Sequence, residues 1–198
     1  MLVDIEQVLY WMEAIRESED PVRTMDSFYR GQINSKLWLA EELDKFIDRY
    51  PVTIDIFGGW TGVLASILFH QTYAIKTIRS IDIDPSCEKI ANMMNENEST
   101  DGRFIAVTGD MCNMHSSADI IINTSCEHIT QDQYDLWLHN LPNTSILVLQ
   151  SNDYDIDEHI RVAKSIDEFK KQCHISILYA GELSLPLYNR WMIIGKKI

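Results

Sequence analysis

The sequence predicts an α/β protein with three layers, in which helices cover both faces of a mostly parallel, seven-stranded sheet. From residue 52 onward, short apolar runs alternate with stretches of helical periodicity, which is typical of repeated β-α units. The first run ends in an acid followed by a glycine-rich turn. Two long runs close the pattern, at 175–185 and 190–196, and the turn at 186–189 predicts that they pair as an antiparallel hairpin.

The same patterns place the individual elements. Apolar residues at helical spacing predict two N-terminal helices, at 2–16 and 35–49, and Pro21 and Pro51 mark their ends. Predicted parallel strands follow at 52–57, 77–83, 103–108, 118–123 and 145–150. Predicted helices lie between and after them at 61–71, 86–97, 130–139 and 156–171, and the polar residues 95–102 are expected to form a surface loop.

Residues 1–50 are interpreted as a helical segment of the same domain as residues 51–198, one that covers an edge of the sheet or the mouth of a site. Within it, residues 28–38 mix polar and aromatic side chains before the second helix, for which Asn34 or Ser35 is a natural N-cap. This stretch is either a lid that adds side chains to a pocket or a simple connection. The side chains in question are Tyr29, Arg30, Gln32 and Lys36.

The composition limits the class of partner. The 198 residues fit one domain, and 45% hydrophobic and 24% charged residues are ordinary for a soluble globular protein. The net charge of −13 opposes binding to a phosphate backbone, so nucleic acid is not expected as a partner. Residues 1–10 lack the basic residues of a signal peptide, and no window approaches ~18 consecutive apolar residues. A cytoplasmic protein without a membrane partner is therefore expected.

The cysteines are widely spaced in a chain of medium size. We interpret them as free thiols in a reducing compartment, because small secreted proteins are the ones that depend on disulfides. They are Cys87, Cys112, Cys126 and Cys173.

Two motifs indicate a ligand site at the carboxyl end of the sheet. The first is the run Asp55-Ile56-Phe57-Gly58-Gly59-Trp60-Thr61-Gly62, and the second is Ile81-Asp82-Ile83-Asp84-Pro85. A strand that leads through glycines into a helix presents backbone groups and a helix N-terminus to a ligand. Dinucleotide binding has weak support, because Phe57 occupies the first position of G-x-G-x-x-G and no Lys or Arg lies in the turn.

These motifs resemble those of the class I S-adenosylmethionine-dependent methyltransferases, a Rossmann-like superfamily, over residues 52–198. The turn after Asp55 has one residue more than the usual spacing between the acid and the last glycine. Asp82 occupies the position that takes the ribose hydroxyls, and Asp110 the position that meets the adenine amino group. The resemblance implies S-adenosylmethionine as the cofactor. Its implied contacts are Asp55, Phe57, Gly58, Gly59, Trp60, Gly62, Asp82, Ile83, Asp110, Met111 and Asn123.

The residue types fit these roles. A carboxylate such as Asp82 can accept two hydrogen bonds from a ribose, and a glycine turn lets backbone groups reach the methionine portion. The alternatives are a solvated or helix-capping acid at Asp82 and an ordinary exposed acid at Asp110. Asp84 is better interpreted as the N-cap of the next helix, with Pro85 at its first position. Trp60 either stacks near the cofactor or packs on the N-terminal helices.

The loop after the fourth strand bears on the methyl acceptor. Base-methylating members of the superfamily carry Asp/Asn-Pro-Pro-aromatic or a Pro-Cys nucleophile there, whereas this chain has Asn123-Thr124-Ser125-Cys126. Glu127 and His128 follow at the place where an acceptor is deprotonated, and an imidazole suits general-base work near neutral pH. Either residue alternatively caps the helix that follows. Residues 151–154 form a second polar cluster, for substrate contact or as a solvated loop.

No metal site is predicted. Cys112, His115, Cys126 and His128 fall on neighbouring strand-end loops, and zinc takes such donors, but their spacing matches no compact motif. Buried thiols and surface histidines account for them.

The leading hypothesis is a methyltransferase that uses S-adenosylmethionine on a small molecule or a protein side chain, with His128 or Glu127 as the catalytic base. One competing hypothesis is a methyltransferase-like binding or regulatory subunit without turnover. Another is a different use of the cofactor, such as aminopropyl transfer or cofactor cleavage. A nucleotide-dependent oxidoreductase ranks last.

Overall fold

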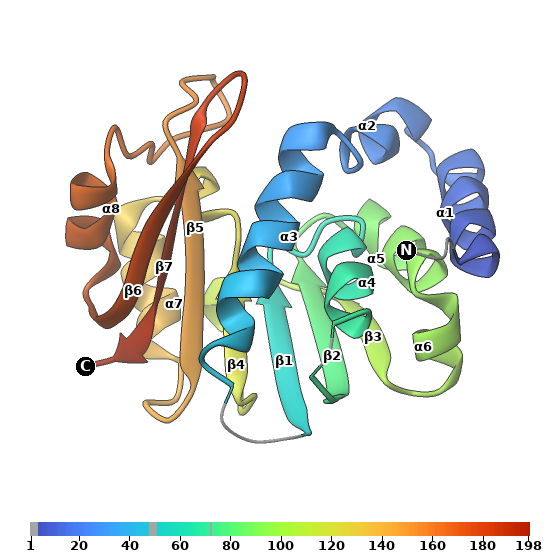
Figure 1. Ribbon diagram of the computed structural model, residues 1–198, viewed down its shortest axis with the longest axis horizontal. Coiled ribbons are helices and arrows are strands. Elements are labelled where there is room, and N and C mark those ends of the chain that lie inside the picture. The colour runs from blue at the N-terminus through green and yellow to red at the C-terminus, as the bar shows by residue number, and fades with distance from the viewer. Residues whose placement is uncertain (1–3, 48–50, 72) are drawn as a thin grey trace.

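The computed structural model describes residues 4–47, 51–71 and 73–198. Over these residues the chain forms one seven-stranded sheet with the strand order β3-β2-β1-β4-β5-β7-β6 (Figure 1). The strands β1 to β5 are parallel, whereas β7 pairs antiparallel with both β5 and β6. The predicted sheet with its terminal hairpin is confirmed. The strands are β1 (Val52–Phe57), β2 (Ile75–Asp82), β3 (Phe104–Thr108), β4 (Ile120–Asn123), β5 (Ile146–Asn152), β6 (Ile175–Ser184) and β7 (Asn189–Lys197).

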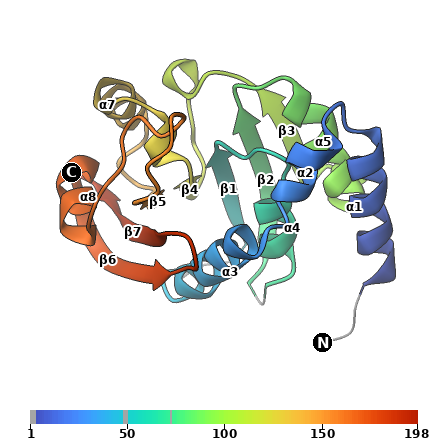
Figure 2. The ribbon, with the colours of Figure 1, turned by 90° about the horizontal axis from the view of Figure 1, so that it is seen from above.

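Helices pack on both faces of this sheet, which gives the predicted three layers (Figure 2). The α-helices are α1 (Ile5–Glu17), α2 (Pro21–Asp26), α3 (Arg30–Asp44), α4 (Val63–Phe69), α5 (Ser86–Met94), α6 (Glu96–Thr100), α7 (Gln131–His139) and α8 (Ile166–Cys173). Two short 3-10 helices, η1 (Met111–Asn113) and η2 (Cys126–His128), follow β3 and β4. None of the helices in the described ranges has the length and apolarity that crossing a membrane requires.

The alternation of side chains along the strands divides the core between the two faces. In β4, Ile120 and Ile122 belong to the cluster that buries α3 and α4, where Leu39 and Leu68 are fully buried. The residue between them, Ile121, belongs to the opposite cluster, which buries α7 and α8. Successive side chains of a strand point to opposite faces, so a continuous apolar strand requires helices on both sides.

The second N-terminal helix lies earlier in the chain than its apolar pattern predicts. Asn34 and Ser35 are interior residues of α3 rather than N-caps, and residues 48–50 of the predicted helix lie outside the described residues. The Ser35 hydroxyl donates to Gln150 Oε1 at 3.1 Å instead of capping. Most of the 28–38 stretch is therefore helix. Of the first predicted helix, residues 2–3 also lie outside the described part.

Two predictions for later parts of the chain are wrong. The helix expected at 156–171 begins only at Ile166, where Ser165 caps it. The preceding residues are irregular because they bond to the strand-end loops, as when the Arg161 amide donates to the Glu127 carbonyl at 3.0 Å. The loop expected at 95–102 contains the short helix α6.

The helices α1 and α2 lie at the carboxyl end of β2, beside α5 (Figures 1 and 2). The Gln7 side chain of α1 donates to the Met94 carbonyl at 2.8 Å, and the buried Ala14 packs with Met94. In α2, Arg23 forms an ion pair with Asp84 at 2.8 Å. These contacts hold the N-terminal helices against the loop that follows β2.

Candidate functional site

The glycine-rich turn after β1 has a backbone that favours glycine. Gly58 and Gly62 have φ values of +66° and +80°, in the left-handed region. A Cβ on Gly62 would lie 2.7 Å from the side-chain nitrogen of Asn95, which donates to the Gly62 carbonyl. A Cβ on Gly58 would lie 2.6 Å from the Ser125 hydroxyl. The turn is therefore held closely against α5 and against the loop after β4.

Asp82 joins this turn to the loop after β2. Its Oδ2 accepts from the Trp60 amide at 2.8 Å, and its Oδ1 accepts from the Asp84 amide at 3.0 Å. Trp60 has a φ of +48°, a strained conformation that clusters at functional sites. The Gly59 amide donates to the Ile81 carbonyl at 3.0 Å, which keeps the turn beside β2. Each carboxylate oxygen of Asp82 keeps a further lone pair for a hydroxyl donor.

The sequence predicts Asp84 as the N-cap of α5, but the N-cap is Pro85, and Asp84 instead bonds to Ser86, the first residue of the helix. Its Oδ1 accepts from the hydroxyl and the amide of Ser86 at 2.7 and 2.9 Å. These hydrogen bonds, and then the charge of Arg23, lower the pKa of Asp84 from its ordinary value. Asp84 thus holds the first residue of α5, while Asp82 keeps lone pairs for a ligand.

A pocket of about 310 Å³ lies between the N-terminal helices, the glycine turn and the start of α5. This volume is at the small end of the range of about 300–1,000 Å³ for ligand pockets. It is lined by Ser18, Glu19, Asp20, Arg23, Thr24, Thr61, Ser86, Cys87 and Ile90.

Two of the predicted cofactor residues have their side chains elsewhere. The Asp55 carboxylate is buried in the sheet, where it accepts from Arg79 at 3.1 and 2.5 Å. Phe57 is fully buried, and its ring meets Trp137 edge-on with 5.5 Å between the centroids. At these two positions only backbone atoms could contact a ligand at the turn. Ile83, by contrast, is 71% exposed.

The remaining predicted contacts lie at the ends of β3 and β4. Asp110 is exposed and caps η1 by accepting from the Cys112 amide at 2.9 Å. Asn123 is fully buried, its Oδ1 accepts from the Ser125 amide, and its Nδ2 lies 3.8 Å from the Met111 sulfur. The structure therefore brings Met111 and Asn123 together and leaves Asp110 at the surface.

Glu127 is the buried centre of the neighbouring loop. Its side chain is 3% exposed, and its Oε1 accepts from Arg190 at 2.7 Å and from Asn152 at 2.6 Å. Its Oε2 is buried and accepts no hydrogen bond from the described residues. The next helix is capped by Thr130 through a capping box, so neither Glu127 nor His128 serves as that cap.

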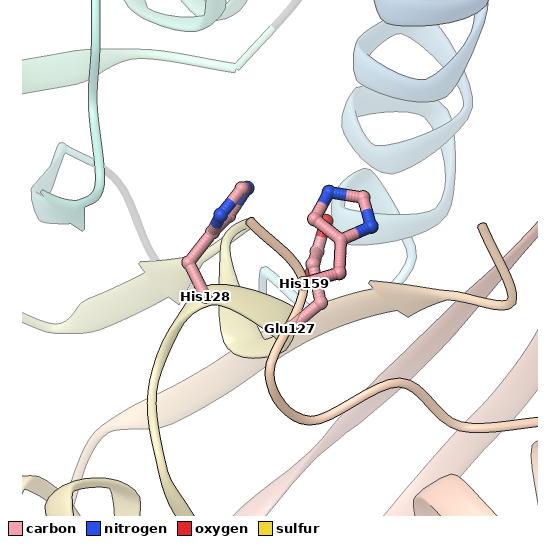
Figure 3. Close-up of side chains that lie close together, drawn as sticks. All are labelled: Glu127, His128 and His159. Carbon is pink, nitrogen blue, oxygen red and sulfur yellow. The ribbon is translucent and has the colours of Figure 1, made fainter. Parts of the chain in front are cut away.

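Two histidines flank Glu127 (Figure 3). His128 is exposed and His159 is partly buried, and their rings meet edge-on with 4.7 Å between the centroids. The Nδ1 atom of His128 lies 3.1 Å from the Glu158 carbonyl, and that of His159 lies 2.6 Å from the Tyr154 carbonyl. The sequence analysis missed His159. The signal for it is the dipeptide Glu-His, which occurs at 127–128 and again at 158–159.

Lys36 adds a buried cation to the same region. Its Nζ donates to Gln32 Oε1 at 2.8 Å. Burial, and then the positive charge of Arg190, lower the pKa of Lys36 to about 7. The bond from Ser35 to Gln150 fixes α3 here, and Gln150 also accepts from Arg190 at 3.5 Å. Arg190 thus lies between Glu127, to which it donates, and Lys36, whose pKa its charge lowers.

The residues weighed as zinc ligands from the sequence are held separately. The Cys126 thiol is fully buried and donates to the Asn123 carbonyl at 3.7 Å, and burial raises its pKa to about 12. The Cys112 thiol donates to the Gln133 carbonyl at 3.6 Å. All four cysteines lie in the described part of the chain and are free thiols, as predicted.

Solved structures of S-adenosylmethionine-dependent enzymes share this architecture. MtNAS in complex with S-adenosylmethionine is 17% identical, with a TM-score of 0.64 over 97% of this chain and 72% of that chain. A methyltransferase from Clostridium acetobutylicum is 14% identical, with a TM-score of 0.62 over 87% and 95% of the two chains. The mitomycin 7-O-methyltransferase MmcR is 16% identical, with a TM-score of 0.60 over 94% and 60%.

Sequence comparison adds nothing to these structural likenesses, since no protein-family model and no curated protein sequence matches the chain. The likeness in structure, together with the strand order and the glycine turn, identifies the architecture. The chain has the class I methyltransferase fold that its motifs predict.

Proposed function

We propose that the protein is an S-adenosylmethionine-dependent methyltransferase that acts on a small molecule or a protein side chain. The observation that carries this proposal is the position of Asp82. Its carboxylate is fixed at the carboxyl end of β2 by the amides of Trp60 and Asp84, beside a glycine turn with no Cβ atoms at Gly58 and Gly62. This arrangement fits a ribose and the methionine portion of the cofactor.

The ribose, the methionine portion and the adenine of the cofactor each have a protein group positioned to contact them. Asp82 accepts the ribose hydroxyls, backbone groups of the glycine turn contact the methionine portion, and Ile83 offers an exposed apolar side chain to the adenine. When bound, the cofactor supplies an electrophilic methyl group on a sulfonium. The protein's contribution is mainly to hold the acceptor in line with that group.

The acceptor side is formed by the loop after β4. Gly58 of the cofactor turn meets Ser125, and Glu127 and His128 follow Ser125 directly, so the proton-accepting groups are next to the cofactor turn. His128 removes a proton if the acceptor requires it, because its exposed ring is accessible. Glu127 is already bonded to Arg190 and Asn152, and it positions this loop.

Titration calorimetry with S-adenosylmethionine and S-adenosylhomocysteine tests the cofactor. We expect binding near micromolar strength, about −8 kcal/mol. Asp82→Asn places an amide donor against the Trp60 or Asp84 amide, so it should weaken binding by at least about tenfold, or 1.4 kcal/mol. Asp101→Asn is the matched control, because its 65% exposed carboxylate lies in the turn before β3. Equal binding by both variants would contradict the proposal.

A second candidate is the transfer of another group of the same cofactor. It is favoured by the likeness to MtNAS, which has been solved with MTA and tNA and matches 97% of this chain, N-terminal helices included. Mass spectrometry of the spent cofactor separates the candidates. S-adenosylhomocysteine indicates methyl transfer, whereas methylthioadenosine indicates the second candidate. Cofactor binding without either product, across an acceptor screen, would favour a binding subunit.

A further inference from the structure

Three metal-ligating side chains meet beside the acceptor loop (Figure 3). One donor atom from each of Glu127, His128 and His159 lies within 4.8 Å of the other two. Glu127 and His128 are neighbours in the loop after β4, whereas His159 comes from the segment after β5. Figure 3 shows the two imidazole rings and the Glu127 side chain gathered at the ends of β4 and β5. Among the described residues, these three side chains form a group of His, Cys, Asp or Glu donors close enough together to hold one ion.

The hydrogen bonds of the two histidines leave the same atom available on each ring. Both Nδ1 atoms lie against backbone carbonyls, of Glu158 and of Tyr154. A carbonyl accepts hydrogen bonds, so each Nδ1 carries the proton and each Nε2 keeps its lone pair. Metal-ligating histidines are oriented in this way, with the second nitrogen donating to a carbonyl or carboxylate.

The Glu127 carboxylate divides its two oxygens between the protein and the cluster. Oε1 is held by Arg190 and Asn152, which fixes the orientation of the carboxylate. Oε2 is buried on a side chain that is 3% exposed, and it accepts no hydrogen bond from the described residues. Burying a charged oxygen without a partner is unfavourable, and a cation would supply the missing interaction.

The surrounding charge is mixed, with a local excess of acid on the outer side. The segment after β5 contributes Asp153, Asp155, Asp157 and Glu158 within six residues. Arg190 and Lys36 lie on the inner side, where Arg190 is already paired with Glu127. The acidic segment attracts cations, and Arg190 binds Oε1 of Glu127 rather than Oε2.

We propose that Glu127 Oε2, His128 Nε2 and His159 Nε2 bind one divalent transition-metal ion of the zinc type. Two imidazoles and one carboxylate are ligands for such ions, whereas magnesium and calcium prefer oxygen alone. Donors around a tetrahedral zinc ion lie about 3.4 Å apart, so the rings close by roughly 1 Å when the ion binds. The exposed His128 ring has room for that movement. Three protein ligands leave a coordination position for water or an acceptor atom. With the ion bound, a metal-bound water would take the proton in place of His128, because the ion occupies the Nε2 lone pair.

Zinc titration of untagged, chelator-treated protein tests the site without cofactor present, so its outcome is independent of the proposed methyl transfer. We expect one zinc ion per chain, with affinity reduced at least about tenfold in His128→Ala and in His159→Ala. His70→Ala is the matched control, because the His70 Nδ1 also lies against a backbone carbonyl, at 2.7 Å from that of Ser66, but outside this cluster. Magnesium should produce no comparable binding.

Glu127→Gln would break a buried ion pair and could unfold the protein. The test therefore uses the two histidine variants, whose side chains are exposed or partly buried. Circular dichroism of both variants checks that they fold. X-ray absorption at the zinc edge of the loaded protein should show two imidazoles in the coordination sphere. Absence of zinc binding, or the same zinc affinity in His159→Ala and His70→Ala, would overturn the proposal.

Discussion

Replacing Lys36 by methionine should stabilise the protein at neutral pH, because it removes a buried ammonium while keeping a long apolar side chain. Burial and the charge of Arg190 lower the Lys36 pKa from 10.5 to about 7. At about 1.4 kcal/mol per unit, this shift corresponds to roughly 5 kcal/mol of destabilisation at low pH. The hydrogen bond from Lys36 to Gln32 offsets about 1 kcal/mol of that. Lys36→Met should therefore gain up to about 4 kcal/mol in free energy of unfolding at pH 7.

The pH dependence has a definite sign. Between pH 7 and 10.5 the unfolded chain keeps the Lys36 proton while the folded chain has lost it, so wild-type stability rises with pH across this window. The penalty is complete below the folded pKa and is relieved as pH approaches the unfolded value. The stability gap between Lys36→Met and wild type should accordingly narrow by roughly 1.4 kcal/mol per pH unit above about pH 7.5.

Urea denaturation followed by tryptophan fluorescence, at several pH values from 6.5 to about 9.5, measures both quantities. Lys45→Met is the matched control, since Lys45 ends the same helix with a 62% exposed side chain and pairs with Glu42. Its effect should stay below about 1 kcal/mol. A gap that is constant with pH, or a Lys36→Met protein less stable than wild type at pH 7, would refute the reasoning.

Further predictions concern stability and thiol chemistry. Arg190→Met leaves the buried Glu127 charge unpaired and should lower the free energy of unfolding, measured by urea denaturation, by about 3–5 kcal/mol. Adding Glu127→Gln should restore part of this loss. Additive effects of the two substitutions would argue against coupling between the two side chains. Gly62→Ala forces an alanine into a left-handed conformation with a φ of +80°. It should lower the free energy of unfolding by at least about 1–2 kcal/mol, measured as a fall in Tm. At pH 8, iodoacetamide should label the partly exposed Cys112 before the buried Cys126, whose pKa burial raises to about 12; peptide mapping that finds the reverse order contradicts the burial.

Local patterns were sufficient to predict the parallel core and the glycine turn after β1. The first three residues of β4, Ile120, Ile121 and Ile122, are all apolar because both faces of the strand are covered, and this continuous run is visible in the sequence. The turn depends on glycines and on Asp82, which are within one β-α-β unit. The apolar strand and the glycine turn depend on residues close together in the sequence, so local sequence patterns predict them.

The buried contacts of Glu127 could not be predicted in the same way. Glu127 takes its partners from β5 and from β7, and Lys36 comes from α3, so the group exists only after distant elements have packed. The segment at 156–165 has apolar residues at helical spacing, but its backbone bonds to the strand-end loops instead. That segment carries His159, which lies beside Glu127 and His128 only because of these contacts.

The insertion of β7 between β5 and β6 has a consequence for how the protein folds. Because β7 follows β6 in the chain, the sheet beyond β5 can be completed only after β7 has been synthesised and has entered between its neighbours. Until then Glu127 has no Arg190 to neutralise it, and a buried carboxylate without a counter-charge opposes compaction of the loop after β4. The hydrogen bonds of Asp82 to the glycine turn and to Asp84 do not involve β7. A chain emerging from the ribosome should therefore form the glycine turn after β1 first and the buried contacts of Glu127 last.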